Sequence, residues 1–213
     1  MKSHHLLLLI RNLNLKSLLD LSFRQIFYSR RIYLLGANLN SANGDVVPPI
    51  GALQFHRLSE DSILEILKEL RKYDQPERIE LLNRIIFFKN GLRNAFACSL
   101  NGNLTSIQWL VLPDENDVLQ RHYRKKYRLL EETQVMLEHV YVFPQFRGLG
   151  LAQYMSLKLL KSAKDLGYKH AISYIKAKNF VSLNLFHAIG FRIFDSTNVC
   201  RVLGHEWRAF RTK

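Results

Sequence analysis

The chain has little cysteine, few acidic side chains and no long apolar run. Its two cysteines, Cys98 and Cys200, form no CxxC pair, and no histidines stand at zinc-finger spacing, which argues against a disulfide scaffold or a structural zinc site. The apolar run over residues 6–10 ends at Arg11, so it is too short for a membrane span or a secretion signal. These absences predict a cytoplasmic protein that contains no metal and no transmembrane segment.

Basic residues outnumber acidic ones by 31 to 18, which gives the 213-residue chain a formal charge of +13. That excess favours an anionic partner, which includes a nucleic acid, an acidic membrane face, an acidic carrier protein and a polyphosphate ligand. The one dense basic cluster, residues 121–128, is typical of a solvated face and gives no clear sign of nucleic-acid binding. With 47% apolar residues the chain has ample material for a buried core, which excludes wholesale disorder.

The N-terminal segment differs in composition from the rest of the chain. It is leucine-rich and basic, with apolar residues at helical spacing at Leu19, Phe23, Ile26 and Phe27. Residues 39–49 then carry Asn-Gly and Pro-Pro pairs, which are typical of a linker. We therefore predict an N-terminal extension over residues 1–47 and a single domain over residues 48–213, and we leave the role of the extension open.

The rest of the chain predicts alternating helices and strands, and hence the α/β class. Helices are expected after Ser59 or Ser62 and from Pro76 onward, and Asn101-Gly102 predicts a hairpin between two strands. Residues 170–175 and the stretch from Phe191 onward are typical of further strands.

Residues 134–142 form the most informative predicted strand. Their alternation would put Glu138, Val140 and Val142 on one face, and His139 and Tyr141 on the other. Glu138 is a lone carboxylate in an otherwise apolar strand. His139 is expected to be a packed or surface side chain on the opposite face.

Two glycines follow this strand, at the point where a helix is expected to begin. Gly148 and Gly150 let the backbone turn tightly and leave no side chain over the amides. The first turn of a helix has N–H groups without intrahelical partners, and these can hold a phosphate. The pattern is neither a P-loop, because no Gly-Lys-Ser/Thr follows, nor a dinucleotide fingerprint, because the third glycine and the downstream acid are missing.

The order of motifs around these glycines resembles the GNAT superfamily of acyl-CoA N-acyltransferases. The motif residues are Val142, Pro144, Arg147, Gly148, Gly150 and Ala152, then Asn179, Ser182 and Leu183, then Gly190 and Phe191. The resemblance implies a GNAT fold, with a central mixed and mostly antiparallel sheet that is splayed in a V and has helices on both faces.

The resemblance also implies where acyl-CoA, the expected co-substrate, would bind. The pyrophosphate would be held by the backbone amides of Arg147, Gly148, Leu149, Gly150, Leu151 and Ala152. The exposed edge of the strand from Val140 to Val142 would pair with the pantetheine arm, and Asn179 and Ser182 would contact it. Two alternatives remain open here: Asn179 as a helix N-cap only, and Ser182 as a small helix residue only.

Catalysis by such a protein needs an unprotonated amine. An alkylamine with a pKa of about 10.4 is mostly charged at neutral pH, so a general base is useful. Glu138 is the candidate general base, and its position matches where the family often places one. The alternative is a glutamate that faces water or pairs with an arginine. The backbone N–H near Val140 would stabilise the oxyanion. The family often has a tyrosine where this chain has Phe186, so no general acid is assigned, and His187 and Tyr174 stay open.

The sequence therefore predicts an N-acyltransferase that moves an acyl group, acetyl by default, from CoA to a primary amine of a small molecule or peptide by direct attack. Two alternatives stay open. One is a longer-chain fatty-acyl transferase that uses acyl-CoA or an acidic acyl carrier protein. The other is a non-catalytic module that binds CoA or docks a partner. A homodimer is also left open.

Overall fold

The structure is a computed structural model that describes residues 27–41, 46–202 and 205–210. The strands of this part of the chain form a single eight-stranded sheet in the order β2-β3-β4-β5-β6-β1-β7-β8. They are β1 (Phe27–Asn38), β2 (Leu53–Arg57), β3 (Ala95–Leu100), β4 (Asn103–Val111), β5 (Gln134–Val142), β6 (His170–Lys176), β7 (Arg192–Val202) and β8 (His205–Phe210).

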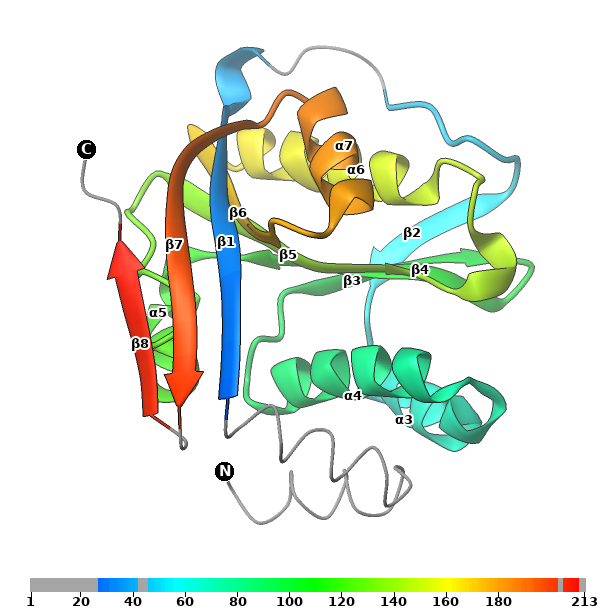
Figure 1. The fold of residues 1–213 in the computed structure, drawn as a ribbon. Helices are drawn as coiled ribbons and strands as arrows, with labels where there is room; N and C mark the ends of the chain where they lie inside the picture. Colours follow the sequence, from blue (N-terminus) through cyan, green and yellow to red (C-terminus); the bar gives the residue numbers. More distant parts are fainter. Residues whose placement is uncertain (1–26, 42–45, 203–204, 211–213) are drawn as a thin grey trace.

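The sheet opens in a V between β5 and β6. These two strands are parallel and pair over three residues, from Gln134 opposite His170 to Met136 opposite Ile172. The other strand pairs are antiparallel. Beyond the third pair β5 and β6 diverge, and in Figure 1 β3 to β5 run at a steep angle to β1, β7 and β8. The predicted fold, a mixed and mostly antiparallel sheet splayed in a V, is confirmed.

Helices cover both faces of the sheet. Helices α3 (Glu60–Glu69), α4 (Gln75–Lys89) and α5 (Asn116–Tyr123) contribute to one core cluster, which also holds Trp109 and Met136. Helices α6 (Leu151–Asp165) and α7 (Phe180–Ala188) contribute to a second cluster with Val135 and Leu137. We call these the α4 face and the α6 face, and Figure 1 shows them on opposite sides of β3 to β5.

Local sequence signals explain where several elements begin and turn. Ser59 caps α3 through a bond from the Ser62 N–H, and Asp74 caps α4 through a bond from the Glu77 N–H. The predicted hairpin joins β3 to β4, where Asn101 and Gly102 both have the positive φ that a two-residue turn of this kind requires.

Strand β1 lies inside the sheet, between β6 and β7. Its residues Ile32 to Asn38 pair with β6, and its residues Phe27 to Gly36 pair with β7. The predicted division at residue 47 assigns this strand to an extension, whereas residues 32–36 pair with a strand on each side and Leu35 is fully buried. The helical spacing expected over residues 19–27 lies outside the described residues except for Phe27, which begins β1.

Candidate active site

A β-bulge interrupts β5 at the edge of the V. Trp109 of β4 lies opposite Glu138, and Ile107 lies opposite Tyr141. Between these two pairs β5 therefore contains one residue more than β4. His139 has a φ of +58°, which is uncommon for a residue with a side chain. The extra residue changes the alternation of faces along the strand.

The bulge corrects two sequence predictions about β5. His139 packs against Phe87 of α4, with ring centroids 4.3 Å apart, so it lies on the α4 face together with Glu138 rather than on the opposite face. Beyond the bulge the pattern is reversed, because Tyr141 joins the α4-face core while Val140 packs with the α6-face core. Simple two-residue periodicity fails here because two residues of β5 occupy one position of the ladder.

Glu138 is buried, with 8% of its surface exposed, and it accepts two hydrogen bonds. The Tyr127 hydroxyl donates to Oε2 and the Tyr174 backbone N–H donates to Oε1, each at 2.9 Å. Burial raises the pKa of the Glu138 carboxyl, and the nearby Lys126 and these two hydrogen bonds partly oppose that rise. The carboxyl is therefore shifted in the direction that suits a general base near neutral pH.

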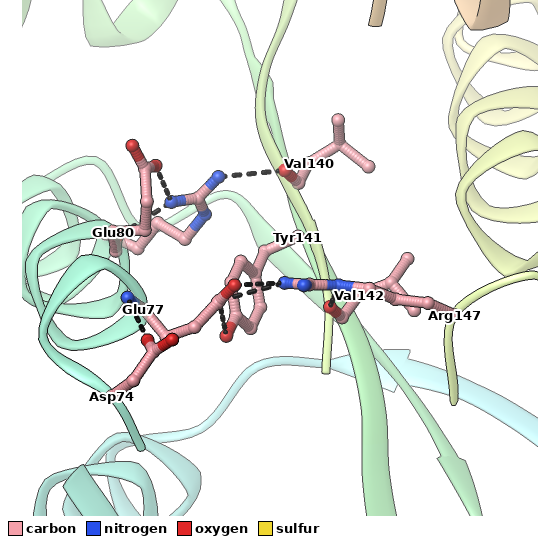
Figure 2. Close-up of polar contacts among 8 residues, drawn as sticks. Asp74, Glu77, Glu80, Val140, Tyr141, Val142 and Arg147 are labelled. Carbon is pink, nitrogen blue, oxygen red and sulfur yellow. Dashed lines mark hydrogen bonds and ion pairs between the residues drawn. The ribbon is translucent and has the colours of Figure 1, made fainter. Parts of the chain in front are cut away.

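Arg84 of α4 holds the backbone of the bulge in place. Its Nε donates to the His139 carbonyl at 3.0 Å and its Nη2 donates to the Val140 carbonyl at 2.9 Å. Its Nη1 forms an ion pair with Glu80 at 2.7 Å, and the guanidinium lies over the Tyr141 ring. Figure 2 labels three of its partners, Glu80 of α4 and Val140 and Tyr141 of β5. The sequence analysis did not identify Arg84. The feature that could have indicated its role is that an arginine stands among the apolar residues of a helix that packs on the sheet.

The glycine loop is tied to α4 by Arg147. Its Nη2 lies 2.8 Å from both carboxylate oxygens of Glu77, and its Nε donates to the Val142 carbonyl at 3.2 Å. The Tyr141 hydroxyl donates to the same Glu77 carboxylate at 2.6 Å, as Figure 2 shows. The Arg147 side chain thus fixes the start of the loop. Glu77 was also missed, because a glutamate in the first turn of a helix is ordinary in sequence.

The glycine loop itself is exposed and open. Gly148 and Gly150 have φ values of +80° and +72°, and a Cβ at Gly148 would meet nothing within 4 Å. Gly150 is the N-cap of α6 and provides no capping side chain, so the first amides of this 15-residue helix keep room for an acceptor from outside the helix. The residues present therefore fit the pyrophosphate of CoA.

A cavity of about 370 Å³ lies in the V, lined by the parts of β5 and β6 that have diverged. Of the predicted site residues it brings together Glu138, Val140, Asn179 and Ser182. Val142 and the loop residues Arg147, Gly148, Leu149, Gly150, Leu151 and Ala152 do not line this cavity. Asn179 is also the N-cap of α7, since its side chain accepts the Ser182 N–H at 3.2 Å.

The position that often holds a tyrosine in related proteins is apolar in this chain. Phe186 lines the cavity, is 2% exposed and packs against Phe191 with ring centroids 4.9 Å apart. Of the two residues left open as proton donors, Tyr174 lines the cavity and His187 does not. The Tyr174 hydroxyl accepts the backbone N–H of Arg128 at 3.1 Å.

The basic cluster at residues 121–128 has two parts. Arg121, Arg124 and Lys125 are exposed, as expected for a solvated face. Lys126 is half-buried and lines the cavity, and the adjacent Tyr127 is part of the α4-face core. Only the inner part of the cluster can therefore act on a molecule in the cavity.

No helix within the described residues is long and apolar enough to cross a bilayer. The same residues contain no group of three His, Cys, Asp or Glu side chains placed to hold a metal ion. Each finding concerns residues 27–41, 46–202 and 205–210 alone.

Three solved structures share the fold. A glucosamine N-acetyltransferase region of a fungal multi-domain GH3 β-N-acetylglucosaminidase aligns with a TM-score of 0.60 at 13% identity, over 87% of this chain and 22% of that one. A Drosophila protein aligns with a TM-score of 0.54 at 14% identity, over 91% of this chain and 59% of that one. A GNAT acetyltransferase from Colwellia psychrerythraea aligns with a TM-score of 0.56 at 13% identity, over 86% of this chain and 60% of that one. The chain thus spans less than two thirds of the length of each of these relatives.

The comparison with curated proteins found no match. Residues 66–191, more than half of the 213-residue chain, match the family model described as Acetyltransferase (GNAT) family. This span runs from α3 to the end of α7 and contains the glycine loop, the bulge and the diverging strands. The chain therefore belongs to the GNAT acetyltransferase family, in which an acyl group passes from coenzyme A to an amine.

Proposed function

We propose that this protein is an N-acyltransferase that moves an acyl group, acetyl by default, from CoA to a primary amine of a small molecule or peptide. The observation that carries the proposal is the buried Glu138, which lines the same cavity as Val140 of β5 and Ser182 at the start of α7. Its raised pKa supports the role of general base. The scarcity of cysteine supports a cytoplasmic location.

In this proposal the α6 face receives the donor. The amides of residues 148–152 hold the pyrophosphate, because the N–H of Arg147, which was also predicted to hold it, already donates to the Pro144 carbonyl at 3.3 Å. The edge of β5 from Val140 to Val142 pairs with the pantetheine arm. The Phe143 N–H donates to the Thr105 carbonyl, so strand alternation turns the Val142 N–H away from β4 and toward the V, while the Val142 carbonyl accepts the bond from Arg147 Nε. Asn179 and Ser182, at the start of α7, complete the donor side.

The reaction is a direct attack by the amine nitrogen on the thioester carbonyl carbon. The C–N bond forms, the C–S bond breaks, and the proton lost by the amine passes to Glu138, directly or through one water molecule. The thiolate of CoA takes the electron pair of the C–S bond. A thiol pKa of about 8.5 makes it a tolerable leaving group without a proton donor, which suits the apolar Phe186.

The carbonyl oxygen of the substrate gains charge during this attack, and the backbone N–H near Val140 is the proposed donor to it. Arg84 is a positioning residue for this donor, because it binds the carbonyls of His139 and Val140 and thereby fixes the peptide planes of the bulge. A donor held before the reaction needs no reorganisation during it, which is the condition for strong electrostatic stabilisation.

The test measures release of free thiol from acetyl-CoA in the presence of a panel of primary amines. Glu138→Gln keeps the shape of the side chain but removes the base, so we expect the rate at neutral pH to fall by about 10² to 10⁴-fold. The wild-type rate should decline on acidification at a pH where an ordinary glutamate is still ionised, because the pKa of Glu138 is raised, and the variant should lack this limb.

Glu132→Gln is the matched control, because Glu132 is exposed and lies outside the cavity. An unchanged rate and pH profile in Glu138→Gln would remove the base assignment. Acyl-CoA binding without thiol release with any amine would favour the non-catalytic alternative. A rate that rises steadily with acyl chain length would favour the fatty-acyl alternative over acetyl transfer.

A further inference from the structure

Basic side chains from distant parts of the sequence meet on the α4 side of the cavity. Arg30 comes from β1, Lys126 from the segment after α5, and Lys176 from the end of β6, and all three line the cavity. Arg30 and Lys126 lie outside the pattern of motifs that identified the family, and Arg30 also lies outside the matched residues 66–191.

Strand register shows which face these side chains occupy. Leu34 of β1 lies opposite Tyr174 of β6, and both pack with the α4-face core. Side chains two residues apart share a face, so Lys176 and Arg30 lie on the α4 face as well. Lys126 places its Nζ 4.7 Å from the centre of the Tyr127 ring, which belongs to that same core. Glu138 shares this face, so the basic groups and the proposed base line one side of the cavity.

Positive charge exceeds negative charge on this side. Among the described residues that line the cavity, the cations are Arg30, Arg84, Lys126 and Lys176, and the carboxylates are Glu80 and Glu138. Glu80 is engaged by Arg84. The pKa of Lys126 is lowered to about 8, mainly by burial, with Arg30, Lys176 and Arg84 acting in the same direction and Glu138 opposing them. Like charges in a partly buried cavity repel one another, and a bound anion would relieve that repulsion.

We infer that Arg30, Lys126 and Lys176 bind a negatively charged group, a carboxylate or a phosphate, that belongs to the same molecule as the acceptor amine. The inference rests on the proposed function and narrows its substrate class from primary amines in general to amines that carry an anion. Amino acids and aminoalkyl phosphates have this chemistry. The amine would then face Glu138 while the anion is held by the cations beside it.

An anion could also arrive on the donor, as the free carboxylate of a dicarboxylic acyl group such as succinyl. The acceptor is the better match, because the cations lie on the face of the proposed base, whereas Asn179 and Ser182 of α7 form the donor side. The experiment therefore includes succinyl-CoA as a separate arm.

The experiment compares amines that differ only in the anion, namely an α-amino acid and its carboxamide, with acetyl-CoA as donor and thiol release as the readout. We expect kcat/KM to be at least tenfold higher for the amino acid. Lys176→Gln should lower this ratio between the two acceptors. Lys178→Gln is the matched control, because Lys178 is an exposed lysine two residues away that does not line the cavity, and it should leave the ratio intact.

Equal kcat/KM for the two acceptors would overturn the inference. A preference for succinyl-CoA over acetyl-CoA with a neutral amine, together with no preference between acceptors, would also overturn it, because the anion would then belong to the donor.

A calorimetric arm separates this inference from the proposed function. The N-acetylated amino acid and its carboxamide are each titrated into wild-type protein and into Lys176→Gln. Tighter binding of the charged ligand that is lost in Lys176→Gln would support the anion site even if no thiol were released with any amine. Equal binding of the charged and neutral ligands would overturn the inference whatever the activity.

Discussion

The two sides of the V-shaped gap present different chemical groups to a ligand. The α6 side uses backbone amides, glycines and small polar residues, as in the loop at Gly148 and Gly150 and at the start of α7. The α4 side uses charged side chains that come from α4, β1, β6 and the segment after α5. Backbone groups suit a ligand that is shared by a family, whereas charged side chains from several elements can be specific to one chain.

The first prediction concerns Arg84, which joins the two sides because it comes from α4 and binds the backbone of β5. Arg84→Leu would leave the carbonyls of His139 and Val140 without their donor, and Glu80 without its cation. We expect a loss of about 1–3 kcal/mol in the free energy of unfolding, because two carbonyls of the bulge lose a charged donor. Denaturant titration measures it, with the exposed Arg71→Leu as control, and a loss equal to that of the control would contradict the account.

The second prediction acts on the α6 side alone. Gly150→Val places a branched side chain at a φ of +72° and beside Pro49, so the loop must change its backbone to accommodate it. Strain of about 1–3 kcal/mol at such a position should weaken acyl-CoA binding by roughly 10- to 100-fold, as calorimetry would show. The control is Gly51→Val, where a Cβ meets nothing within 4 Å. Unchanged affinity would remove the loop from the donor site.

The third prediction concerns pH and the α4 side. Lys126, with a pKa of about 8, is charged at pH 7 and mostly neutral at pH 9, and its titration is coupled to Glu138, Arg30, Lys176 and Arg84. In a solvent-exposed site, loss of one positive charge near a bound anion should lower the binding free energy of that anion by about 1 kcal/mol, or about fivefold in affinity. The preference for an anionic over a neutral acceptor should therefore fall between pH 7 and pH 9. A preference that grows over this range would contradict the role of Lys126.

The smallest expected effect is that of the outer basic cluster. Replacing Arg121, Arg124 and Lys125 together with glutamine should leave kcat within about twofold, because these side chains are exposed and do not line the cavity. If an anionic partner docks there, its association should be weakened more at low salt than at high salt. Equal weakening at both ionic strengths would favour a structural role for the cluster.

The local structure of the α6 side could be predicted because its signals act over a few residues. The turns at Gly148 and Gly150 and the helix start at Asn179 are of this kind. Glu138 became the candidate base for a similar reason, as a single carboxylate in an apolar strand, and that role stays a prediction. The bulge at His139 was not predicted, because strand alternation alone does not show where a ladder gains a residue.

The α4 side could not be predicted, because it depends on tertiary packing. Arg84 meets β5 only through the docking of α4, and Arg30 reaches the cavity only because β1 is inserted between β6 and β7. That insertion pairs residues at opposite ends of the chain, and composition suggested an extension there instead. Long-range pairing of this kind leaves no periodic signal in the sequence.

The difference between the two sides is tested most directly by steady-state kinetics with Gly150→Val and Lys176→Gln, in which KM is measured separately for the acyl-CoA and for an anionic acceptor. The account predicts that Gly150→Val raises mainly the KM for acyl-CoA and that Lys176→Gln raises mainly the KM for the acceptor. It would be contradicted if Lys176→Gln raised the KM for acyl-CoA and left that of the acceptor unchanged.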